Sequence, residues 1–391
     1  MKLIALILGI SIMCCCCNNT PANDDNTPST SENGTTTDTT NENQGKLDVL
    51  KPAAYGDIDA LSLEPGSCIS IIGRYAGGSY WEEVEKGANQ AIEDINETLG
   101  YKGDDKVKLS FSSPDITDDI DEQIAILDEE LAIYPIAICI AAIDTTACEV
   151  QFDLAAENSI PIITFDSGSD YQNITAHIST DNIEAAATAA ANLGELMEGT
   201  GEIAIFVQDS QSMTAKDREN GFVNKMKSAY PDINIAAIYH LDELKTMVKQ
   251  IVAEKNADLP EEEQTKEEDI DFASYTQEDI IKYILEKNPN LKGIYTTNLD
   301  TTQLIAEVLN DLKKTDLYFV GFDGGEEQME LLEDGVVNGL ILQNPYGMGY
   351  ASVVAAARTV LTLGNEAVID SGFTWVTKEN MELPEIKAML Y

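Results

Sequence analysis

The most constraining feature of this 391-residue sequence is the regular alternation of short apolar runs with amphipathic stretches from residue 68 onward. The runs are rich in Ile and Val, and a segment of helical periodicity follows each of them. Strands that alternate with helices in this way predict parallel sheets covered by helices on both faces. The first four runs are CISIIG (68–73), VKLSFSS (107–113), IAICIAAID (136–144) and PIITFD (161–166).

Five further runs follow a short HISTDN segment (177–182). They are EIAIFVQ (202–208), INIAAIYH (233–240), KGIYTTN (292–298), LYFVGFD (317–323) and GLILQN (339–344). Two sheets accommodate these strands better than one, and the length and the 43% apolar content supply enough material for two cores. We therefore predict an α/β fold of two doubly wound, Rossmann-like lobes with parallel sheets.

The first seventeen residues, MKLIALILGISIMCCCC, predict export. The apolar run from Leu3 to Met13 is too short to span a bilayer and has the length of the apolar part of a signal peptide. The cysteine cluster resembles the lipidation site of bacterial lipoproteins, so 1–17 is expected to be a lipoprotein signal. An uncleaved signal or a metal-binding tract is the alternative. The candidates for the lipidated residue are Cys14, Cys15, Cys16 and Cys17.

Residues 18–65 are expected to form a disordered tether between this anchor and the folded body. Their N-terminal part, NNTPANDDNTPSTSENGTTTDTTNENQG, has almost no apolar residues to offset the entropy of folding. Cys68, Cys139 and Cys148 lie in or beside apolar runs, which indicates small core residues and not a disulfide framework.

The net charge of −45, from 69 acidic and 24 basic residues, excludes nucleic acid and anionic membrane surfaces as partners. A lipid anchor is thus the only membrane contact predicted. An acidic insertion at about 254–279 holds eleven acids and two lysines, which predicts an exposed, solvated segment. Its spacing is too loose for a calcium loop, and we predict neither a metal nor a cofactor.

Polar residues end nearly every apolar run. In doubly wound sheets, ligands bind beyond the carboxyl ends of the strands, so these residues are candidates for a binding site. Asp144 and Asp166 fit helix N-caps equally well. The candidates at these ends are Arg74, Asp144, Asp166, Ser167, Asn298, Asp323, Gln343 and Asn344.

The stretch GRYAGGSYWEEVEKGA (73–88) places two adjacent aromatic residues, Tyr80 and Trp81, at the start of an expected helix. Adjacent helical positions point about 100° apart, so the two rings cannot share one buried stripe. At least one of them is therefore expected to serve another purpose.

Enzyme signatures are missing from the sequence. It has two histidines, His177 and His240, and lacks GxSxG, P-loop and HExxH motifs. The glycines of GRYAGG have the wrong spacing for a dinucleotide fingerprint, and Ser167 has no evident neighbouring base. We therefore expect a protein that is not an enzyme.

Seven dispersed motifs occur between Ser67 and the C-terminus: SYWEEVEKGA, IPIITFDS, HISTDN, AKDRENGF, GIYTTN, FVGFDG and WVTKEN. In this order they resemble the type I periplasmic sugar-binding proteins of ABC importers, close to the ribose-binding group. The resemblance implies two lobes joined by three chain crossings, near Thr180, Gln343 and Gly372. The first lobe would comprise 66–180 with 344–372, and the second 181–343 with 373–391.

The resemblance also implies roles for individual residues. Tyr80 and Trp81 match an aromatic pair that lies against a sugar ring. Carboxylates, amides and arginines suit hydroxyls, which both donate and accept hydrogen bonds. The polar residues that match the family's sugar-binding positions are Asp166, Arg218, Asn298, Asp323 and Gln343.

Several positions depart from the family pattern. Ser167 stands where many ribose-type members have an arginine, and Leu299 where an acid is usual, so ribose itself is not expected. Arg74 is a candidate to replace the lost positive charge or to recognise an anionic group. Tyr239 and His240 are candidates for the wall opposite the aromatic pair.

The function implied is a monomeric, extracytoplasmic solute-binding protein, lipid-anchored in the cell envelope. It would capture a sugar or polyol between its lobes and deliver it to the permease of an ABC transporter. Because the ligand contacts both lobes, it would favour the closed form. A receptor of the same fold that presents sugar to a membrane kinase or chemoreceptor remains an alternative, and an enzyme is the third.

Overall fold

The computed structural model of the protein describes residues 39–257 and 259–391. The predicted lipoprotein signal (1–17) with its candidate cysteines, and residues 18–38 of the predicted tether, lie outside the described residues. Within the described ranges, every helix is too short or too polar to cross a membrane.

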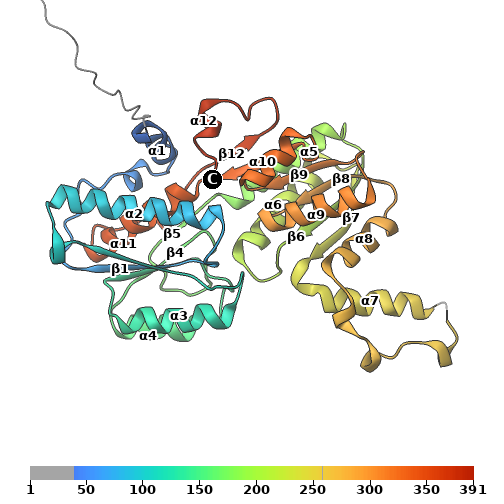
Figure 1. The fold of residues 1–391 in the computed structure, drawn as a ribbon, viewed down its shortest axis with the longest axis horizontal. Helices are drawn as coiled ribbons and strands as arrows, with labels where there is room; N and C mark the ends of the chain where they lie inside the picture. The colour runs from blue at the N-terminus through green and yellow to red at the C-terminus, as the bar shows by residue number, and fades with distance from the viewer. Residues whose placement is uncertain (1–38, 258) are drawn as a thin grey trace, which may run out of the picture. The chain divides into compact units, whose positions relative to one another are not determined.

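The described part of the chain contains two six-stranded sheets, each with its own helices (Figure 1). We call the sheet with strand order β11-β5-β4-β3-β1-β2 and its helices the N-lobe, and the sheet with order β12-β10-β9-β8-β6-β7 and its helices the C-lobe. The strands pair in parallel, except that β12 runs antiparallel to β10. The predicted fold class is thus confirmed.

The nine predicted apolar runs all form strands, and three short strands occur in addition. The N-lobe strands are β1 (Cys68–Ile72), β2 (Lys108–Ser112), β3 (Ala137–Ile140), β4 (Ile162–Phe165), β5 (His177–Ser179) and β11 (Val368–Asp370). The C-lobe strands are β6 (Gly201–Val207), β7 (Ile233–His240), β8 (Leu291–Thr296), β9 (Tyr318–Phe322), β10 (Gly339–Gln343) and β12 (Phe373–Val376). The additional strands are β5 and β11, which have three residues each and are too short for apolar periodicity to reveal, and β12, whose four residues FTWV include a polar one.

Helices cover both faces of each sheet, as parallel strands require. In the N-lobe, α2 (Ser79–Leu99) and α11 (Pro345–Val360) lie on one face, and α3 (Ile120–Ala132) and α4 (Glu149–Glu157) on the other (Figure 1). In the C-lobe, α5 (Asn182–Leu196) and α6 (Met213–Ala229) pack on one face. The other face carries α7 (Leu244–Ala257), α8 (Gln277–Lys287), α9 (Leu299–Leu312), α10 (Glu326–Glu333) and α12 (Pro384–Lys387).

Two glycines allow α2 and α11 to approach each other closely. A Cβ atom at Gly349 would lie 1.9 Å from the backbone oxygen of Val84, and one at Gly87 would lie 2.0 Å from that of Tyr346. Backbone atoms cannot rotate away from such a contact, so only glycine fits at these positions.

The chain passes between the lobes after β5, after β10 and between β11 and β12. These crossings are hydrogen-bonded to one another. Thr180 Oγ1 donates to Gln343 Oε1 (2.9 Å), and Asn344 Nδ2 donates to the backbone oxygen of Ser371 (2.9 Å). Both lobes belong to one compact unit, Thr40–Tyr391. We refer to these three crossings as the hinge.

The prediction of a disordered tether is wrong for residues 43–65, which we call the N-terminal strap. The strap includes the end of α1 (Thr39–Asp48) and a 3₁₀ turn at Ala53–Gly56. Its apolar side chains were hidden from the sequence analysis because they directly follow a long polar stretch with which they were grouped. The strap residues buried in the N-lobe core are Leu47, Leu50, Tyr55, Ile58, Leu61 and Leu63.

The strap also binds the hinge. Lys46 is 8% exposed, its Nζ lies 2.8 Å from Glu83 Oε2, and its backbone oxygen accepts a bond from Asn344 Nδ2 (2.7 Å). Lys51 and Asp370 exchange backbone hydrogen bonds of 2.9 and 3.0 Å. The strap is therefore attached to two of the three crossings.

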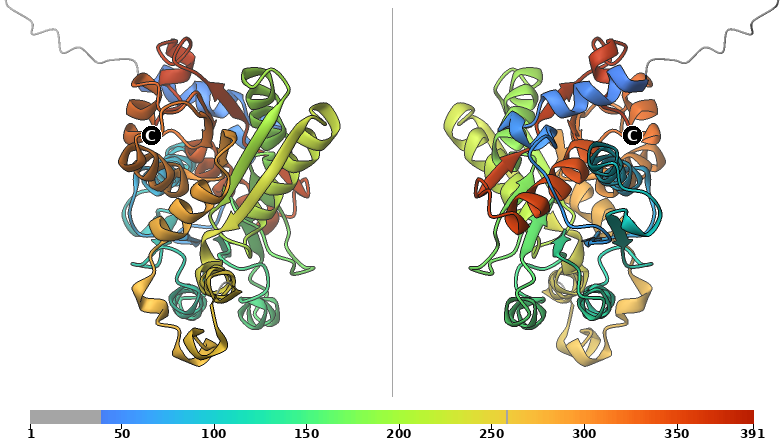
Figure 2. Two further views of the ribbon diagram at one scale, coloured as in Figure 1. Left: turned by 90° about the vertical axis from the view of Figure 1, so that its right-hand side faces the viewer. Right: turned by 90° about the vertical axis from the view of Figure 1, so that its left-hand side faces the viewer.

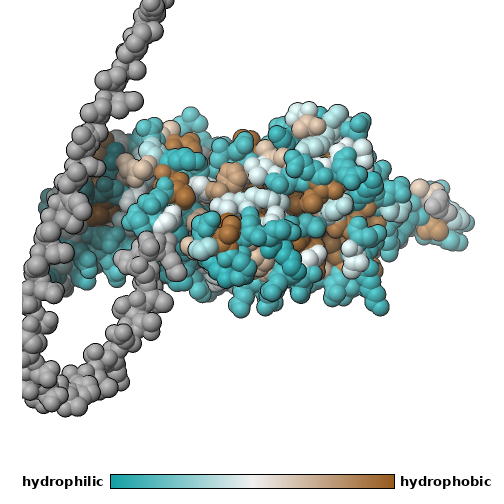
Figure 3. Space-filling view, turned by 90° about the horizontal axis from the view of Figure 1, so that it is seen from above, coloured by the Kyte–Doolittle hydropathy of each residue, from teal (hydrophilic) through white to brown (hydrophobic). Residues whose placement is uncertain are grey.

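The acidic insertion comprises the end of α7, three 3₁₀ turns and the start of α8. The described acids of these turns are exposed, and the two views of Figure 2 show the segment extending beyond the other C-lobe elements. The face of the molecule in Figure 3 is mostly hydrophilic outside the grey atoms, as expected for so acidic a sequence.

The stability of the protein is expected to fall in mild acid because of His177. Burial lowers the pKa of this residue to about 4, so the unfolded chain takes up a proton near pH 6.5 and the folded chain does not. Between pH 7 and pH 5 this difference removes about 2 kcal/mol from the free energy of unfolding. Urea denaturation at the two pH values measures this loss. The free energy of unfolding of His177→Asn should fall by about 2 kcal/mol less than that of the wild type.

His240→Asn is the matched control for this experiment. A hydrogen bond to Glu219 raises the pKa of His240, so its contribution is present at low pH and is lost as the pH rises. This variant should therefore lose more stability on acidification than the wild type. If the wild type and both variants lost equal stability on acidification, the pKa shifts assigned to His177 and His240 would be contradicted.

Candidate functional site

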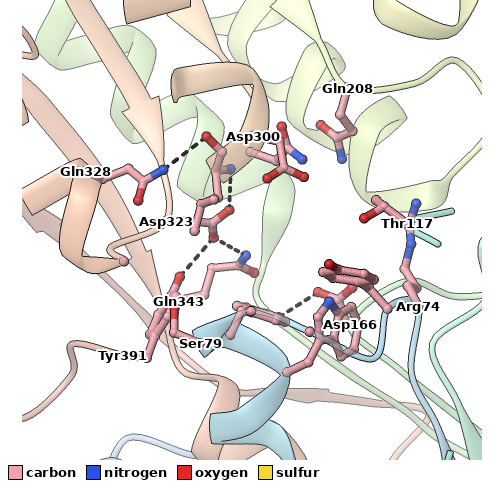
Figure 4. Close-up of a pocket in the computed structure, with 18 of the residues that line it drawn as sticks. Arg74, Ser79, Thr117, Asp166, Gln208, Asp300, Asp323, Gln328, Gln343 and Tyr391 are labelled. Atoms are coloured by element: carbon pink, nitrogen blue, oxygen red, sulfur yellow. Dashed lines mark hydrogen bonds between the residues drawn. The ribbon is translucent and has the colours of Figure 1, made fainter. Parts of the chain in front are cut away.

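A cavity of about 490 Å³ lies between the lobes, at the carboxyl ends of the strands (Figure 4). Its volume is typical of small-molecule sites. Eight of the nine predicted ligand-binding residues line it: Arg74, Tyr80, Trp81, Asp166, Arg218, Asn298, Asp323 and Gln343. The ninth, Ser167, does not line it. Ser167 is fully buried, and its Oγ has no hydrogen-bond partner among the described residues.

The aromatic pair lies in the first turn of α2, at the cavity. Tyr80 donates its hydroxyl to Asp166 Oδ1 (2.7 Å). The Trp81 ring meets Tyr80 edge to face at 5.2 Å and Phe165 at 6.3 Å. Burial, followed by the nearby Asp166 carboxylate, raises the pKa of the Tyr80 phenol well above its ordinary value, so Tyr80 remains a donor.

Asp166 directs a carboxylate into the cavity from the end of β4. Its backbone is left-handed (φ 54°), a conformation that aspartate tolerates, and it is 7% exposed. Burial raises the pKa of Asp166, and the positive charges of Arg218 and Arg74 oppose this rise without cancelling it. The two arginines thus help to keep a buried carboxylate charged.

Arg218, on α6, is held in a fixed orientation. Its Nε donates to Asn182 Oδ1 and its Nη1 to the backbone oxygen of Thr297, both at 2.7 Å. The guanidinium lies 4.3 Å from the centre of the Phe322 ring. Its Nη2 makes no hydrogen bond to any described residue, which leaves a donor for a ligand.

Arg74 is neutralised by carboxylates from both lobes. Its Nε and Nη2 donate to Asp118 Oδ1 of the N-lobe (2.9 and 2.6 Å), and Nη2 lies 3.5 Å from Asp209 Oδ2 of the C-lobe. Burial alone would lower the pKa of this guanidinium, but the two carboxylates raise it above its ordinary value. Arg74 therefore links the lobes, and its charge is not free to recognise an anion.

Asp323 also has a left-handed backbone (φ 73°) at the end of its strand, but its oxygens are already occupied. Oδ1 accepts from Gln343 Nε2 (2.7 Å) and from the Tyr391 hydroxyl (3.1 Å), and Oδ2 accepts from the Leu299 backbone nitrogen (2.8 Å). Asn298 caps α9 through Oδ1, which accepts from the Thr301 nitrogen (3.0 Å). Asp323 and Asn298 thus have structural roles beside any contact with a ligand.

Several cavity residues were missed by the sequence analysis. Gln208 ends the predicted β6 run, and Asp300 lies two residues after Asn298 in the first turn of α9, so a strand end gave a direct signal for Gln208 alone. Tyr391 gave none, because it is distant in sequence from the other cavity residues. The missed lining residues with polar side chains include Tyr75, Ser79, Thr117, Asp118, Gln208, Thr214, Asp300, Glu326, Glu327, Gln328 and Tyr391.

The two residues proposed for the opposite wall lie elsewhere. Tyr239 is buried in the C-lobe core and donates its hydroxyl to Gln277 Oε1 (2.7 Å). His240 Nε2 lies 2.7 Å from Glu219 Oε2. Neither lines the cavity.

The cavity is rich in acids. Six carboxylate residues and two arginines line it, and one of these arginines is the paired Arg74. No group of three or more acidic, His or Cys side chains in residues 39–257 and 259–391 is arranged to hold a metal ion. The site thus offers aromatic surface with fixed hydrogen-bond donors and acceptors, in a field that repels anions.

The chain belongs to the periplasmic binding protein family, whose sequence model, described as a periplasmic binding protein domain, matches residues 69–364. This finding confirms the family that the dispersed motifs predict.

Individual relatives support this membership. The chain is 23% identical to the D-allose-binding periplasmic protein of Escherichia coli (strain K12) over 290 residues, which are 72% of this chain and 80% of that protein. It resembles a carbohydrate transporter solute-binding protein from Agrobacterium radiobacter, solved with D-arabinose, with a TM-score of 0.67 and 26% identity over 83% of this chain and 99% of that one. A solute-binding protein from Agrobacterium vitis, solved with D-fucose, has the same fold, with a TM-score of 0.67 and 24% identity over 83% of this chain and 100% of that one.

Proposed function

We propose that this protein is an extracytoplasmic solute-binding protein that captures an uncharged sugar or polyol between its lobes and delivers it to the permease of an ABC transporter. The observation that carries this proposal is a cavity between the lobes that combines an aromatic pair with fixed hydrogen-bonding groups. The relatives described above are named for sugar binding and transport, not for catalysis. We further propose that the protein is monomeric and held at the membrane by a lipid on one of Cys14 to Cys17.

The chemistry of the cavity suits hydroxyl groups. The Asp166 carboxylate offers an acceptor from the N-lobe, and Arg218 offers a donor from the C-lobe. A sugar hydroxyl satisfies both at once, and hydrogen bonds to charged groups are the stronger kind. The Trp81 ring supplies apolar surface for the C–H face of a sugar.

Ligand binding would favour closure of the lobes. Asp166 and the aromatic pair belong to the N-lobe, whereas Arg218 and Asn298 belong to the C-lobe. A ligand that contacts both sets binds the closed form more tightly and shifts the equilibrium toward it. In the structure, the pair of Arg74 with Asp209 already connects the two lobes.

A thermal-shift screen of the protein tests the proposal. The panel pairs neutral sugars with their acids, for example glucose with glucuronate and galactose with galacturonate. A ligand at 100 times its Kd adds about 2.7 kcal/mol to stability, enough to raise the Tm by a few degrees. We expect shifts with neutral sugars or polyols only, because Arg74 is paired and the cavity is acidic. A panel without any shift would refute sugar binding, and shifts confined to the acids would refute the electrostatic argument.

Replacing Trp81 with alanine is expected to weaken binding of a sugar found in that screen. The change removes aromatic surface from the cavity, and a central aromatic contact is worth roughly 2–4 kcal/mol, or about 30- to 1,000-fold in Kd. Trp81→Phe keeps an apolar ring and should lose much less. Isothermal titration of the three proteins measures the effect, and equal affinities would remove Trp81 from the site.

The same residue provides a signal for ligand binding. Trp81 and Trp375 are the two tryptophans of the sequence, and Trp375 lies in β12, outside the cavity lining. In a Trp375→Phe background, tryptophan emission reports on the cavity alone. Emission that does not change on saturation with sugar would contradict the placement of the ligand beside Trp81.

A further inference from the structure

Tyr391 places its phenol inside the cavity, where Figure 4 shows it beside Asp323 and Gln343. Its hydroxyl donates to Asp323 Oδ1 (3.1 Å) and accepts from the Gly324 backbone nitrogen (3.2 Å). Its ring meets the Tyr80 ring of the N-lobe edge to face, with centroids 5.5 Å apart. Tyr391 thus lines the cavity from the C-lobe side and touches the opposite lobe.

The segment that carries Tyr391 is anchored to the C-lobe. Ile386 and Met389 are buried in its core, and Leu390 packs against the same core. Burial and the Asp323 carboxylate raise the pKa of the Tyr391 phenol well above its ordinary value, so the hydroxyl stays a donor. The phenol is therefore a fixed wall of the C-lobe.

This wall changes what Asp323 can offer a ligand. A carboxylate has about four acceptor positions, and three donors of the protein itself already occupy three of those of Asp323. The Tyr391 hydroxyl donates to a carboxylate and accepts from a backbone nitrogen, as a sugar hydroxyl would. It occupies the place that a hydroxyl of a longer ligand would need.

We propose that Tyr391 is a specificity-determining residue that excludes sugars with a hydroxymethyl group at the Asp323 end of the cavity. This inference rests on the sugar-binding function proposed above. Pentoses and 6-deoxyhexoses lack that hydroxyl and fit beside the phenol. A hexose has to displace the phenol or leave its own hydroxyl without a partner, and buried polar groups that lose their partners reduce affinity strongly.

The test is isothermal titration of wild type, Tyr391→Ala and Tyr391→Phe with D-arabinose, D-ribose, D-fucose, D-galactose and D-glucose. D-Fucose and D-galactose are the matched pair, because they differ only in the hydroxyl on C6. We expect the wild type to prefer D-fucose to D-galactose, and Tyr391→Ala to change that ratio of affinities at least tenfold in favour of D-galactose. Tyr391→Phe keeps the ring but frees one acceptor position of Asp323 Oδ1, which still accepts from Gln343, so this variant should fall between the two.

A control variant and the alternative outcomes distinguish the role of Tyr391 from the proposed sugar-binding function. Glu385→Ala, an exposed change on α12, should leave the ratio unchanged, and melting curves check that each variant is folded. A wild type that prefers D-galactose, or a ratio that Tyr391→Ala moves by less than threefold, would overturn the role of Tyr391 and leave sugar binding intact. If none of the proteins binds any of the five sugars, the proposed function fails and this inference fails with it.

Discussion

Asp166→Asn is expected to weaken sugar binding by about 30- to 4,000-fold, or roughly 2–5 kcal/mol, while the unliganded protein remains as stable as the wild type or becomes more stable. The affinity falls because the variant loses the charged acceptor opposite Arg218. Stability does not fall, because burial raises the pKa of Asp166, which means that folding disfavours its ionised form. This cost in the free energy of unfolding is absent below the ordinary pKa of aspartate. It grows as the pH rises from that value to the raised pKa of Asp166.

Isothermal titration and thermal melting together test this expectation. Ser167→Ala is the matched control at the neighbouring position, since its hydroxyl is buried away from the cavity without a partner among the described residues. It should bind sugar as the wild type does and gain up to about 1 kcal/mol of stability. If Ser167→Ala weakened binding as much as Asp166→Asn, the conclusion that Asp166 and not Ser167 faces the cavity would be wrong.

Gly349→Ala is expected to destabilise the protein by roughly 3 kcal/mol or more, a large effect for the addition of one methyl group. The new Cβ would lie 1.9 Å from the Val84 backbone oxygen, and α2 and α11 would have to separate to accommodate it. Both helices contribute to the N-lobe core, and α2 also carries the aromatic pair. The variant should therefore lose sugar affinity as well as stability.

Gly45→Ala is the control for this substitution. Gly45 is an exposed residue of α1, and a Cβ there would meet nothing within 4 Å. Alanine is the better helix former by about 1 kcal/mol, so this variant should be neutral or more stable. Chemical denaturation of both variants gives the comparison, and a Gly349→Ala protein as stable as the wild type would show that the helices separate at little cost.

The sequence was sufficient to predict most of the fold because the central strands are continuous apolar runs. Burial on both faces leaves a strand such as Ala137–Ile140 without any polar residue, and its short length and Ile content favour a strand. The short strands β5 and β11 escaped prediction because three residues are too few to form a recognisable apolar run. The strap escaped because segment composition averaged its apolar residues with the polar stretch before them.

The cavity was predicted less completely, for two physical reasons. Successive side chains near a strand end point in different directions, so only one of the neighbours Asp166 and Ser167 enters the cavity. Pairing between distant residues is also invisible in a sequence: Asp118 and Asp209 neutralise Arg74 from two different loops. Tyr391 could not be predicted for the same reason, because it contacts Asp323 only in the folded chain.

The attachment of the strap to the hinge determines where a pull on the N-terminal chain would act. Lys46 and Lys51 bind Asn344 and Asp370, at the axis about which the lobes would turn. Tension from the preceding residues would thus act close to the hinge. It would have little effect on the separation of the two lobes. Because the strap is also buried in the N-lobe core, the chain would hold the N-lobe beside the hinge and leave the C-lobe free to turn about it.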